Sequence, residues 1–537
     1  MSFGQAISDA GARDGRFAVS AEARLALGLV GVWALMSVLT LAPGALVLTR
    51  HEGDAMHLAA MVLRMAEGQW PHVDFMTPIG ALALAPIAGL VALGLGLGQA
   101  IIWSQILFAA ALLPVIWWVA MSRFGSGWIG MIYGALVLVM VMAMVHGGTT
   151  QAVSVSMHYN RWAWALAFVI VPLVLVPSQR AYAPWREGTI LGAAFVALAL
   201  IKVTYVPALL PAVLLALSLR RAYGTMAWGV GCGLALCAGI TMWGGLAFWQ
   251  GYVADLFAVA QSETRQQPGG TLSQNLVAPT HLAGTLAGLA AVILLRKAGR
   301  PVEGIVMLAL LPGFIVIAWQ NYGNDAQWLP VVALALLVLR PERDRTAFVV
   351  TAAVALALSS GWMANMATSG LRMFGTDVSE SGVFFPGAPA HADFRLDQTR
   401  LDKVVVATPY APLAAPTDGP DWGLEIDECT LRSGGMRVFH AVADELAEAG
   451  YTGRPMLVAD TFQSFWLFGD FPALPGGAPW YYGGLPGAAV AEIIAVPLCP
   501  TNPDVRTILM QAVTDAGWTY SEVYRGTHVA VLELGRP

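Results

Sequence analysis

The sequence predicts a polytopic α-helical membrane protein followed by a smaller soluble α/β domain. Of the 537 residues, 57% are hydrophobic and only 12% are charged, whereas soluble domains carry about 25% charged residues. Apolar runs that could cross a bilayer as helices recur as far as residue 364 and then stop. We therefore expect a cytoplasmic N-terminus over residues 1–24, a transmembrane part over 25–364 and a periplasmic domain over 365–537.

The apolar runs predict about 11 to 12 membrane crossings. They lie near residues 25–48, 79–98, 99–121, 128–146, 162–177, 188–219, 226–249, 278–295, 303–319, 328–340 and 346–364. The run 188–219 is long enough for two short crossings, and we divide it near Lys202 because a charged side chain interrupts it there. The Gly-rich run 79–98 contains Pro86 and is expected to form a re-entrant or interfacial hairpin without a net crossing.

Basic residues in the short loops predict the orientation, because Lys and Arg collect on the cytoplasmic side of a membrane. They occur at Arg13, Arg16, Arg24, Arg123, Arg180, Arg186, Arg220, Arg221, Arg296, Lys297, Arg300, Arg340, Arg343 and Arg345. The loop 50–78 and the C-terminal domain are then periplasmic, and the protein is expected in a bacterial inner (cytoplasmic) membrane. The net charge of −5 is spread thinly and predicts no nucleic-acid partner.

The C-terminal third alternates helices and strands, which is typical of a small α/β domain. We expect helices near 435–449 and 503–516, strands at 455–460 and 491–496, and a hairpin at 519–525 and 527–534. The stretch 369–421 is expected to be irregular. Cys429 and Cys499 are the only cysteines of this third, and an even pair in an oxidising compartment predicts one disulfide.

The loop after the first apolar run holds the candidate catalytic residues. Its ionisable side chains are His51, Glu52, Asp54, His57, His72 and Asp74. Such a density beside a bilayer is costly unless the residues face water and serve a function. Glu52 and Asp54 could supply a general base or help to hold a divalent metal ion. In the alternative interpretation, Asp54 only caps the helix that follows and its neighbours are solvated.

That following helix is expected over residues 55–69 and is amphipathic. Met56, Ala60 and Leu63 share one face, whereas Arg64 lies nearer the other. A helix of this kind favours a position in the membrane interface, with its polar face in water.

These motifs resemble the first extracytoplasmic loop of GT-C glycosyltransferases, and most closely bacterial relatives of protein O-mannosyltransferases and the aminoarabinose transferases (family 39-like). The likeness is carried by His51-Glu52-Gly53-Asp54, Gly68-Gln69-Trp70-Pro71 and Val73-Asp74-Phe75-Met76-Thr77-Pro78. The family often has Asp-Glu where this chain has His51-Glu52, and that Asp is its usual base. The resemblance therefore implies that Glu52, Asp54 or His51 is the base, with Asp74 as a supporting acid, although the departure also fits an inactive member.

The resemblance implies a polyprenyl-phosphate sugar as donor and an exported lipid, glycan or protein as acceptor, in a GT-C-like fold among membrane lipids. In that family, a carboxylate deprotonates the acceptor hydroxyl, which attacks the anomeric carbon with inversion. The leaving lipid phosphate needs cationic partners, which are Lys202 and Arg161 beside Tyr159 and Asn160. No metal site is assigned, because the loop 147–160 lacks the carboxylate that some metal-dependent members have there.

Several of these residues have a simpler interpretation. Lys202 and Arg161 could merely reach the lipid headgroups, and Asn321 with Tyr322, which could contact sugar hydroxyls, also fit a tight turn. Asp460, Asp470, Trp466 and Trp480 could line a carbohydrate-binding surface or belong to an ordinary core.

Two other functions fit the sequence. A transporter or flippase of lipid-linked sugars would use the same cationic face without a carboxylate base. A non-enzymatic membrane anchor would instead carry the periplasmic domain as a binding module.

Overall fold

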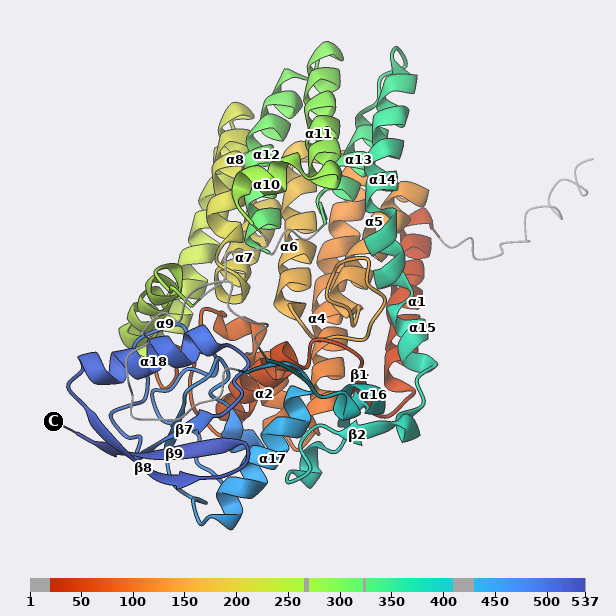
Figure 1. The fold of residues 1–537 in the computed structure, drawn as a ribbon. Helices are drawn as coiled ribbons and strands as arrows, with labels where there is room; N and C mark the ends of the chain where they lie inside the picture. The colour runs from red at the N-terminus through yellow and green to blue at the C-terminus, as the bar shows by residue number, and fades with distance from the viewer. Residues whose placement is uncertain (1–19, 265–269, 322–324, 409–428, 537) are drawn as a thin grey trace, which may run out of the picture.

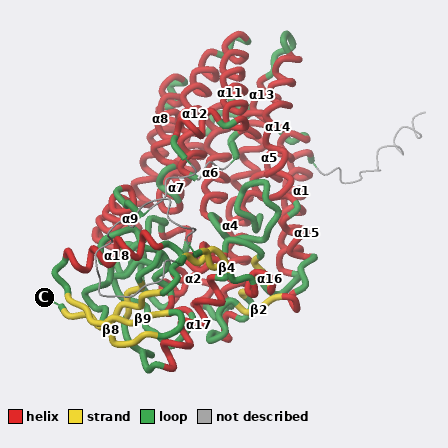
Figure 2. The backbone as a smooth tube through the Cα atoms, viewed as in Figure 1, coloured by secondary structure: helices red, strands yellow, loops and turns green. Residues whose placement is uncertain are grey.

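The computed structural model describes residues 20–264, 270–321, 325–408 and 429–536. Helices stand side by side in a bundle, and the C-terminal region lies against one end of it (Figure 1). The strands gather at that same end (Figure 2). Among the described residues, seven helices are long and apolar enough to span a membrane, and three shorter apolar helices accompany them. The chain thus has the helices of a multi-pass membrane protein.

Most of the predicted apolar runs lie on one helix each, and the run 188–219 divides into two. These helices are α1 (Ala21–Leu41), α4 (Leu97–Val119), α5 (Trp128–Met142), α6 (His158–Leu175), α7 (Pro184–Ile201), α8 (Tyr205–Leu219), α9 (Tyr223–Ala260), α11 (Pro279–Lys297), α12 (Pro301–Gln320), α13 (Leu329–Leu339) and α14 (Arg345–Ala367). Lys202 is the C-cap of α7, as the division at this residue predicts. Short helices follow three of them: the π-helical turn Ala120–Phe124 after α4, α10 (Leu272–Val277) after α9 and α15 (Ser369–Phe374) after α14.

The run 79–98 forms no long helix. It contains the 3-10 turn Ala81–Ala83 and the short helix α3 (Ala85–Ala92). At about 1.5 Å per residue, α3 is far too short to cross a hydrocarbon core of about 30 Å. This agrees with the expected segment without a net crossing.

Ion pairs hold helix ends together at the end of the bundle that lies away from the C-terminal region. Arg123, after α4, pairs with Glu187 in the first turn of α7 at 2.6 Å. Arg220, after α8, pairs with Glu303 in the first turn of α12 at 3.3 Å. Each acid lies at a helix N-terminus, where the helix dipole favours negative charge. The predicted clusters of basic residues around Arg123 and Arg220 thus meet at one end, while its cytoplasmic location stays a prediction.

Strands from distant parts of the sequence pair at the end of the bundle that contacts the C-terminal region. Strand β1 (Leu46–Leu48) pairs in parallel with β3 (Phe394–Asp397), and β2 (Ser381–Val383) pairs antiparallel with β3. Just before β3, the Asp393 carboxylate accepts the backbone N–H of Gln99 at 2.6 Å in the first turn of α4. The C-terminal region therefore caps a helix of the bundle.

The C-terminal region has the helices and strands that the sequence predicts. A four-stranded sheet has the order β6-β7-β9-β8, in which only β6 and β7 are parallel. Its strands and flanking helices are β6 (Met456–Val458), β7 (Ile493–Pro497), β8 (Thr519–Arg525), β9 (Val529–Gly535), α17 (Gly435–Glu448) and α18 (Pro503–Asp515). The described part of 369–421 is more ordered than expected, because it holds α15, β2, β3, α16 (Gln398–Asp402) and β4 (Val405–Ala407), which pairs with β5 (Thr430–Ser433).

The apolar core continues from the helix bundle into the C-terminal region. Buried residues of the bundle, of α2 (Glu52–Ala66) and of α17 belong to one cluster of contacts. A second core lies between the four-stranded sheet and α18, around Leu457, Ile494 and Leu509. The loop that carries the candidate catalytic residues is therefore packed between the helix bundle and the C-terminal region.

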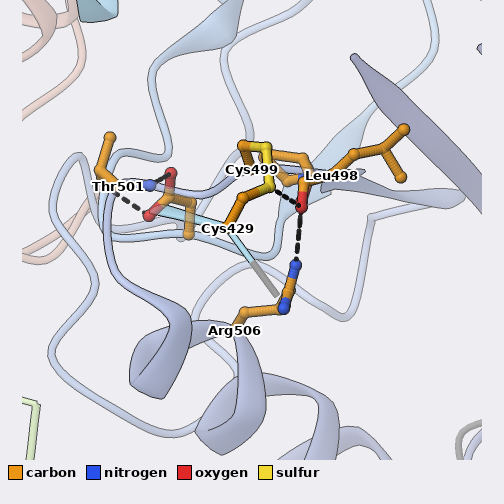
Figure 3. The surroundings of a disulfide bond; sticks show 7 residues. Cys429, Leu498, Cys499, Thr501 and Arg506 are labelled. Atoms are coloured by element: carbon orange, nitrogen blue, oxygen red, sulfur yellow. Dashed lines mark hydrogen bonds between the residues drawn. A yellow bond between two sulfur atoms is a disulfide. The ribbon is translucent and has the colours of Figure 1, made fainter. Parts of the chain in front are cut away.

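A disulfide and a buried carboxylate fix the loop after β7. Cys429 and Cys499 are bonded, beside Leu498 and Thr501 (Figure 3). The Asp460 carboxylate accepts the Thr501 backbone N–H at 2.7 Å and the Thr501 hydroxyl at 2.6 Å. Asp460 thus holds this loop within the fold and is not part of a carbohydrate-binding surface.

Removing the disulfide should destabilise the C-terminal region. The two cysteines are 70 residues apart, so the bond restricts a long loop of the unfolded chain and contributes about 2–5 kcal/mol. We expect the Cys429→Ser/Cys499→Ser double variant to unfold at a lower temperature in detergent, and reductant to lower the midpoint of the wild type similarly. Cys232→Ser, which removes a free cysteine, is the control. Equal midpoints for all three proteins would contradict the prediction.

Candidate functional site

The first loop is organised by helix α2, which runs through the predicted catalytic motif. The helix begins at Glu52, earlier than the expected residue 55, and Asp54 lies in its first turn. His51 precedes it with a left-handed backbone (φ 62°). For a residue with a side chain this conformation is uncommon, and it turns the chain from β1 sharply into the helix.

The expectation that Arg64 lies on a solvated face of an interfacial helix is wrong. Arg64 is only 1% exposed. Its guanidinium donates to the carbonyl of Leu474 at 3.1 Å and to the side-chain oxygen of Gln69 at 3.0 Å. The guanidinium also lies over the ring of Trp466. The C-terminal region covers this face of α2, so the face that local sequence marks as polar is buried by a distant part of the chain.

Two further residues of α2 face the C-terminal region. A Cβ at Gly53 would lie 2.6 Å from the ring of Phe462, so only glycine allows this ring to approach. The ring of His57 lies 5.3 Å from that of Trp480. Gly53, His57 and Arg64 follow the spacing of one helical face, and this face is the contact surface of α2 with the C-terminal region.

The neighbouring face of α2 meets the loop between α5 and α6. The hydroxyl of Ser156 donates to the Asp54 carboxylate, and Nδ1 of His51 lies 3.0 Å from the hydroxyl of Ser154. Burial raises the pKa of Asp54 above the usual 3.8, although the hydrogen bond from Ser156 opposes the shift. Burial lowers the pKa of His51, against the attraction of Asp54. Asp54 thus has the environment of a strengthened base.

His146 is close both to His51 and to the predicted cationic residues Arg161 and Lys202. Its ring lies 4.8 Å from that of His51. Burial lowers the pKa of His146 to about 4, and the positive charges of Arg161 and Lys202 contribute to that shift. His146 is therefore neutral at pH 7, and it lies within the electrostatic reach of both groups of residues.

Arg161 is fully buried in the first turn of α6. One guanidinium nitrogen donates to the carbonyl of Val145, whereas Nε and the other terminal nitrogen are buried without a hydrogen-bond partner. Its neighbour Asn160 accepts a hydrogen bond of 2.6 Å from the Tyr205 hydroxyl. A long cationic side chain that reaches lipid headgroups would be exposed, so the snorkelling interpretation of Arg161 does not fit.

Lys202 joins α7, α6 and the end of α12. Its ammonium donates to the side-chain oxygen of Asn321 and lies 5.1 Å above the ring of Tyr159, within cation–π range. Asn321 in turn donates to the carbonyl of Ile317 at 2.7 Å. The structure therefore brings three predicted residues together. Tyr322 lies outside the described residues.

Glu52 and Asp74 have other partners. Glu52 forms an ion pair of 2.5 Å with Arg400 of α16, a helix that also lines a hollow of about 520 Å³ in the C-terminal region. The exposed Asp74 accepts the Trp70 backbone N–H at 2.6 Å and so closes a turn. Of the two carboxylates among the candidates for the base, Asp54 is thus the one without an ion-pair partner among the described contacts.

Sequence reasoning missed several residues of the site. His146, Ser154 and Ser156 lie in a stretch without acids, and no local pattern connects them with the first loop. Arg400 lies 348 residues from Glu52, so no local pattern could connect them. Within the described ranges, no three His, Cys, Asp or Glu side chains gather as a possible metal site.

Comparisons with known proteins add nothing to this geometry. No family model matches the chain, and neither the curated proteins nor the solved structures yield a match.

The ion pair between Glu52 and Arg400 should couple the first loop energetically to the C-terminal region. In a double-mutant cycle with Glu52→Gln and Arg400→Gln, we expect a coupling free energy of about 1 kcal/mol from thermal unfolding, because Glu52 is 13% exposed. The control is the more exposed pair of Arg454 and Glu492, whose side chains are 32% and 51% exposed. Its coupling should stay below about 0.5 kcal/mol. Equal coupling in the two cycles would contradict the assignment.

Proposed function

We propose that this protein is a membrane glycosyltransferase that moves a sugar from a polyprenyl-phosphate donor to an exported acceptor hydroxyl. Asp54 acts as the general base, and Arg161 with Lys202 binds the donor phosphate. The membrane supplies the lipid-linked donor, and the end of the bundle that carries α2 and the C-terminal region faces the periplasm.

The main support for the proposal is the buried guanidinium of Arg161, two of whose nitrogens have no hydrogen-bond partner. A buried guanidinium without an anion is costly. Guanidinium binds phosphate through two parallel hydrogen bonds, which is the preferred geometry of such pairs. Lys202, which shares the surroundings of His146 with Arg161, adds a second positive charge. A lipid phosphate matches this arrangement.

Asp54 supports the reaction type. Its pKa is raised by burial, and a base with a higher pKa removes a hydroxyl proton more effectively. His146 lies beside His51, and the charges of Arg161 and Lys202 contribute to its lowered pKa. These contacts relate the proposed base to the residues proposed to bind the phosphate. A transporter of lipid-linked sugars would need the cations but would have no use for this carboxylate.

In the proposed reaction, the Asp54 carboxylate takes the proton of the acceptor hydroxyl. The hydroxyl oxygen forms a bond with the anomeric carbon while the bond from that carbon to the phosphate oxygen breaks. The bonding electrons leave with the lipid phosphate, whose growing negative charge Arg161 and Lys202 stabilise. Attack from the side opposite the phosphate inverts the anomeric centre.

Asp54→Asn and Arg161→Gln should separate the two roles. We expect Asp54→Asn to lower the rate of sugar transfer by at least about 100-fold with little change in donor binding, because the base is lost. Arg161→Gln should instead weaken donor binding and also slow transfer. The measurement is transfer of radiolabelled sugar from polyprenyl-phosphate donors by the full chain in proteoliposomes, with donor binding measured separately.

Asp470→Asn, which changes an exposed carboxylate, is the matched control and should transfer normally. Full transfer by Asp54→Asn would overturn the proposed base. Movement of donor across the vesicle membrane without any transfer would favour the flippase instead.

The pH profile of transfer should report the ionisation of Asp54. A general base must be deprotonated, so kcat/KM should fall as the pH is lowered through the pKa of this carboxyl. Because burial raises that pKa, the fall should be centred above the usual value of 3.8. The measurement is kcat/KM between pH 4 and pH 8 in the wild type and in Asp54→Glu, whose midpoint should shift. An unchanged midpoint would assign the ionisation to another group.

A further inference from the structure

An aromatic loop of the C-terminal region lies against the same helix that carries the proposed base. The loop covers residues 476–484, with Trp480 near its middle. Its start is tied to the first loop, because Gly476 donates its backbone N–H to the carbonyl of Asp74 at 2.8 Å, and Met76 donates to that of Gly477 at 3.0 Å. Gly476 has a φ of 68°, which favours glycine and turns the loop toward α2.

Trp480 is held in a defined position beside α2. Tyr481 donates its backbone N–H to the carbonyl of Thr461 at 2.8 Å, and Phe462 and Trp480 form an isolated antiparallel bridge. The rings of these two residues lie 5.0 Å apart in an edge-to-face arrangement. Trp480 is nevertheless only half-buried, so part of its indole is not covered by this packing.

His57 supplies an unpartnered polar group next to this indole. Its residue is 8% exposed, and its Nε2 is buried without a hydrogen-bond partner. Burial lowers the pKa of His57 to about 4, so the ring is neutral at pH 7. A neutral imidazole with a free ring nitrogen can donate or accept a hydrogen bond, and leaving that capacity unused in a buried place costs about 1–3 kcal/mol.

The position of His57 on α2 relates this pair to the reaction. Asp54 and His57 are three residues apart in the helix, so their Cβ atoms are neighbours, about 5–6 Å apart. A ligand that touches Trp480 and His57 would therefore have its nearest hydroxyl close to the carboxylate that we assign as the base. A pyranose ring offers what both side chains need, because it has an apolar face for the indole and hydroxyls for the imidazole.

We infer that Trp480 and His57 form the acceptor subsite and that the acceptor is a saccharide whose ring stacks on Trp480. This inference rests on the proposed transfer function, since it names the acceptor class of that reaction. The C-terminal region then contributes directly to substrate binding. The indole supplies stacking and His57 selects a hydroxyl-bearing ring.

The test is saccharide binding by the full chain carrying Asp54→Asn, which removes the proposed base. Saturation-transfer NMR in nanodiscs measures binding of methyl α-mannopyranoside, chitobiose and maltose as probes. We expect at least one of them to bind, and Trp480→Ala to weaken its binding about 3- to 10-fold, the usual range for one aromatic contact. Trp480→Phe, which keeps an aromatic face, should retain most of the affinity. His57→Ala should weaken binding as well.

Trp518→Ala is the matched control. Trp518 packs in the second core of the C-terminal region, so its loss should leave the saccharide affinity unchanged if the fold persists, as thermal unfolding would verify. The inference is overturned if none of the probes binds, or if Trp480→Ala and Trp518→Ala weaken binding equally.

The two proposals fail in different ways. Saccharide binding that depends on Trp480, in a protein that transfers no sugar from any polyprenyl-phosphate donor, would support the subsite and overturn the transferase. Sugar transfer with an acceptor KM that Trp480→Ala leaves unchanged would overturn the subsite and support the transferase.

Discussion

Helix α2 is buried between the helix bundle and the C-terminal region, and this burial sets the surroundings of every candidate base. This helix carries polar groups on two adjoining faces, and each face packs against a different part of the chain. Arg64 finds the Leu474 carbonyl in the C-terminal region, whereas Asp54 finds Ser156 between α5 and α6. A buried polar group that loses its partner costs about 1–3 kcal/mol, and more if it is charged. The C-terminal region therefore cannot separate from the bundle without breaking the hydrogen bond from Arg64 to Leu474, and it is part of the site rather than an appendage.

This packing gives the two carboxylates of the motif, Glu52 and Asp54, different electrostatic surroundings. Glu52, which precedes Asp54 by two residues, is paired with Arg400, so its charge is neutralised from the C-terminal side. Asp54 receives only a hydroxyl donor and the proximity of His51, and its pKa rises as a result of burial. His146 stays neutral because burial lowers its pKa, and the positive charges of Arg161, Arg50 and Lys202 lower it further. One carboxylate of the motif thus becomes structural and the other remains available for proton transfer.

The cationic side of the site is built by the bundle alone. Arg161 begins α6, Lys202 ends α7 and Asn321 ends α12, so three helix ends meet at one level. The division of the long apolar run at Lys202 has a direct consequence here, because it ends α7 where the ammonium can reach Asn321. The residues proposed to bind the donor phosphate therefore lie at helix ends of the bundle, while those proposed to contact the acceptor come from α2 and a loop of the C-terminal region.

The local structure follows from the amino-acid pattern: the apolar helices, the division at Lys202, the short segment after residue 79 and the helices and strands after 435. These depend on composition and periodicity over about 20 residues, which a local pattern contains. The sequence also marked His51, Asp54, Arg161 and Lys202 as candidates. The burial of Arg64, the ion pair of Glu52 with Arg400 and the contact of His146 with His51 became evident only in the folded chain. The physical reason is that burial and ion pairing depend on which distant segments meet, and no local pattern in the chain records that.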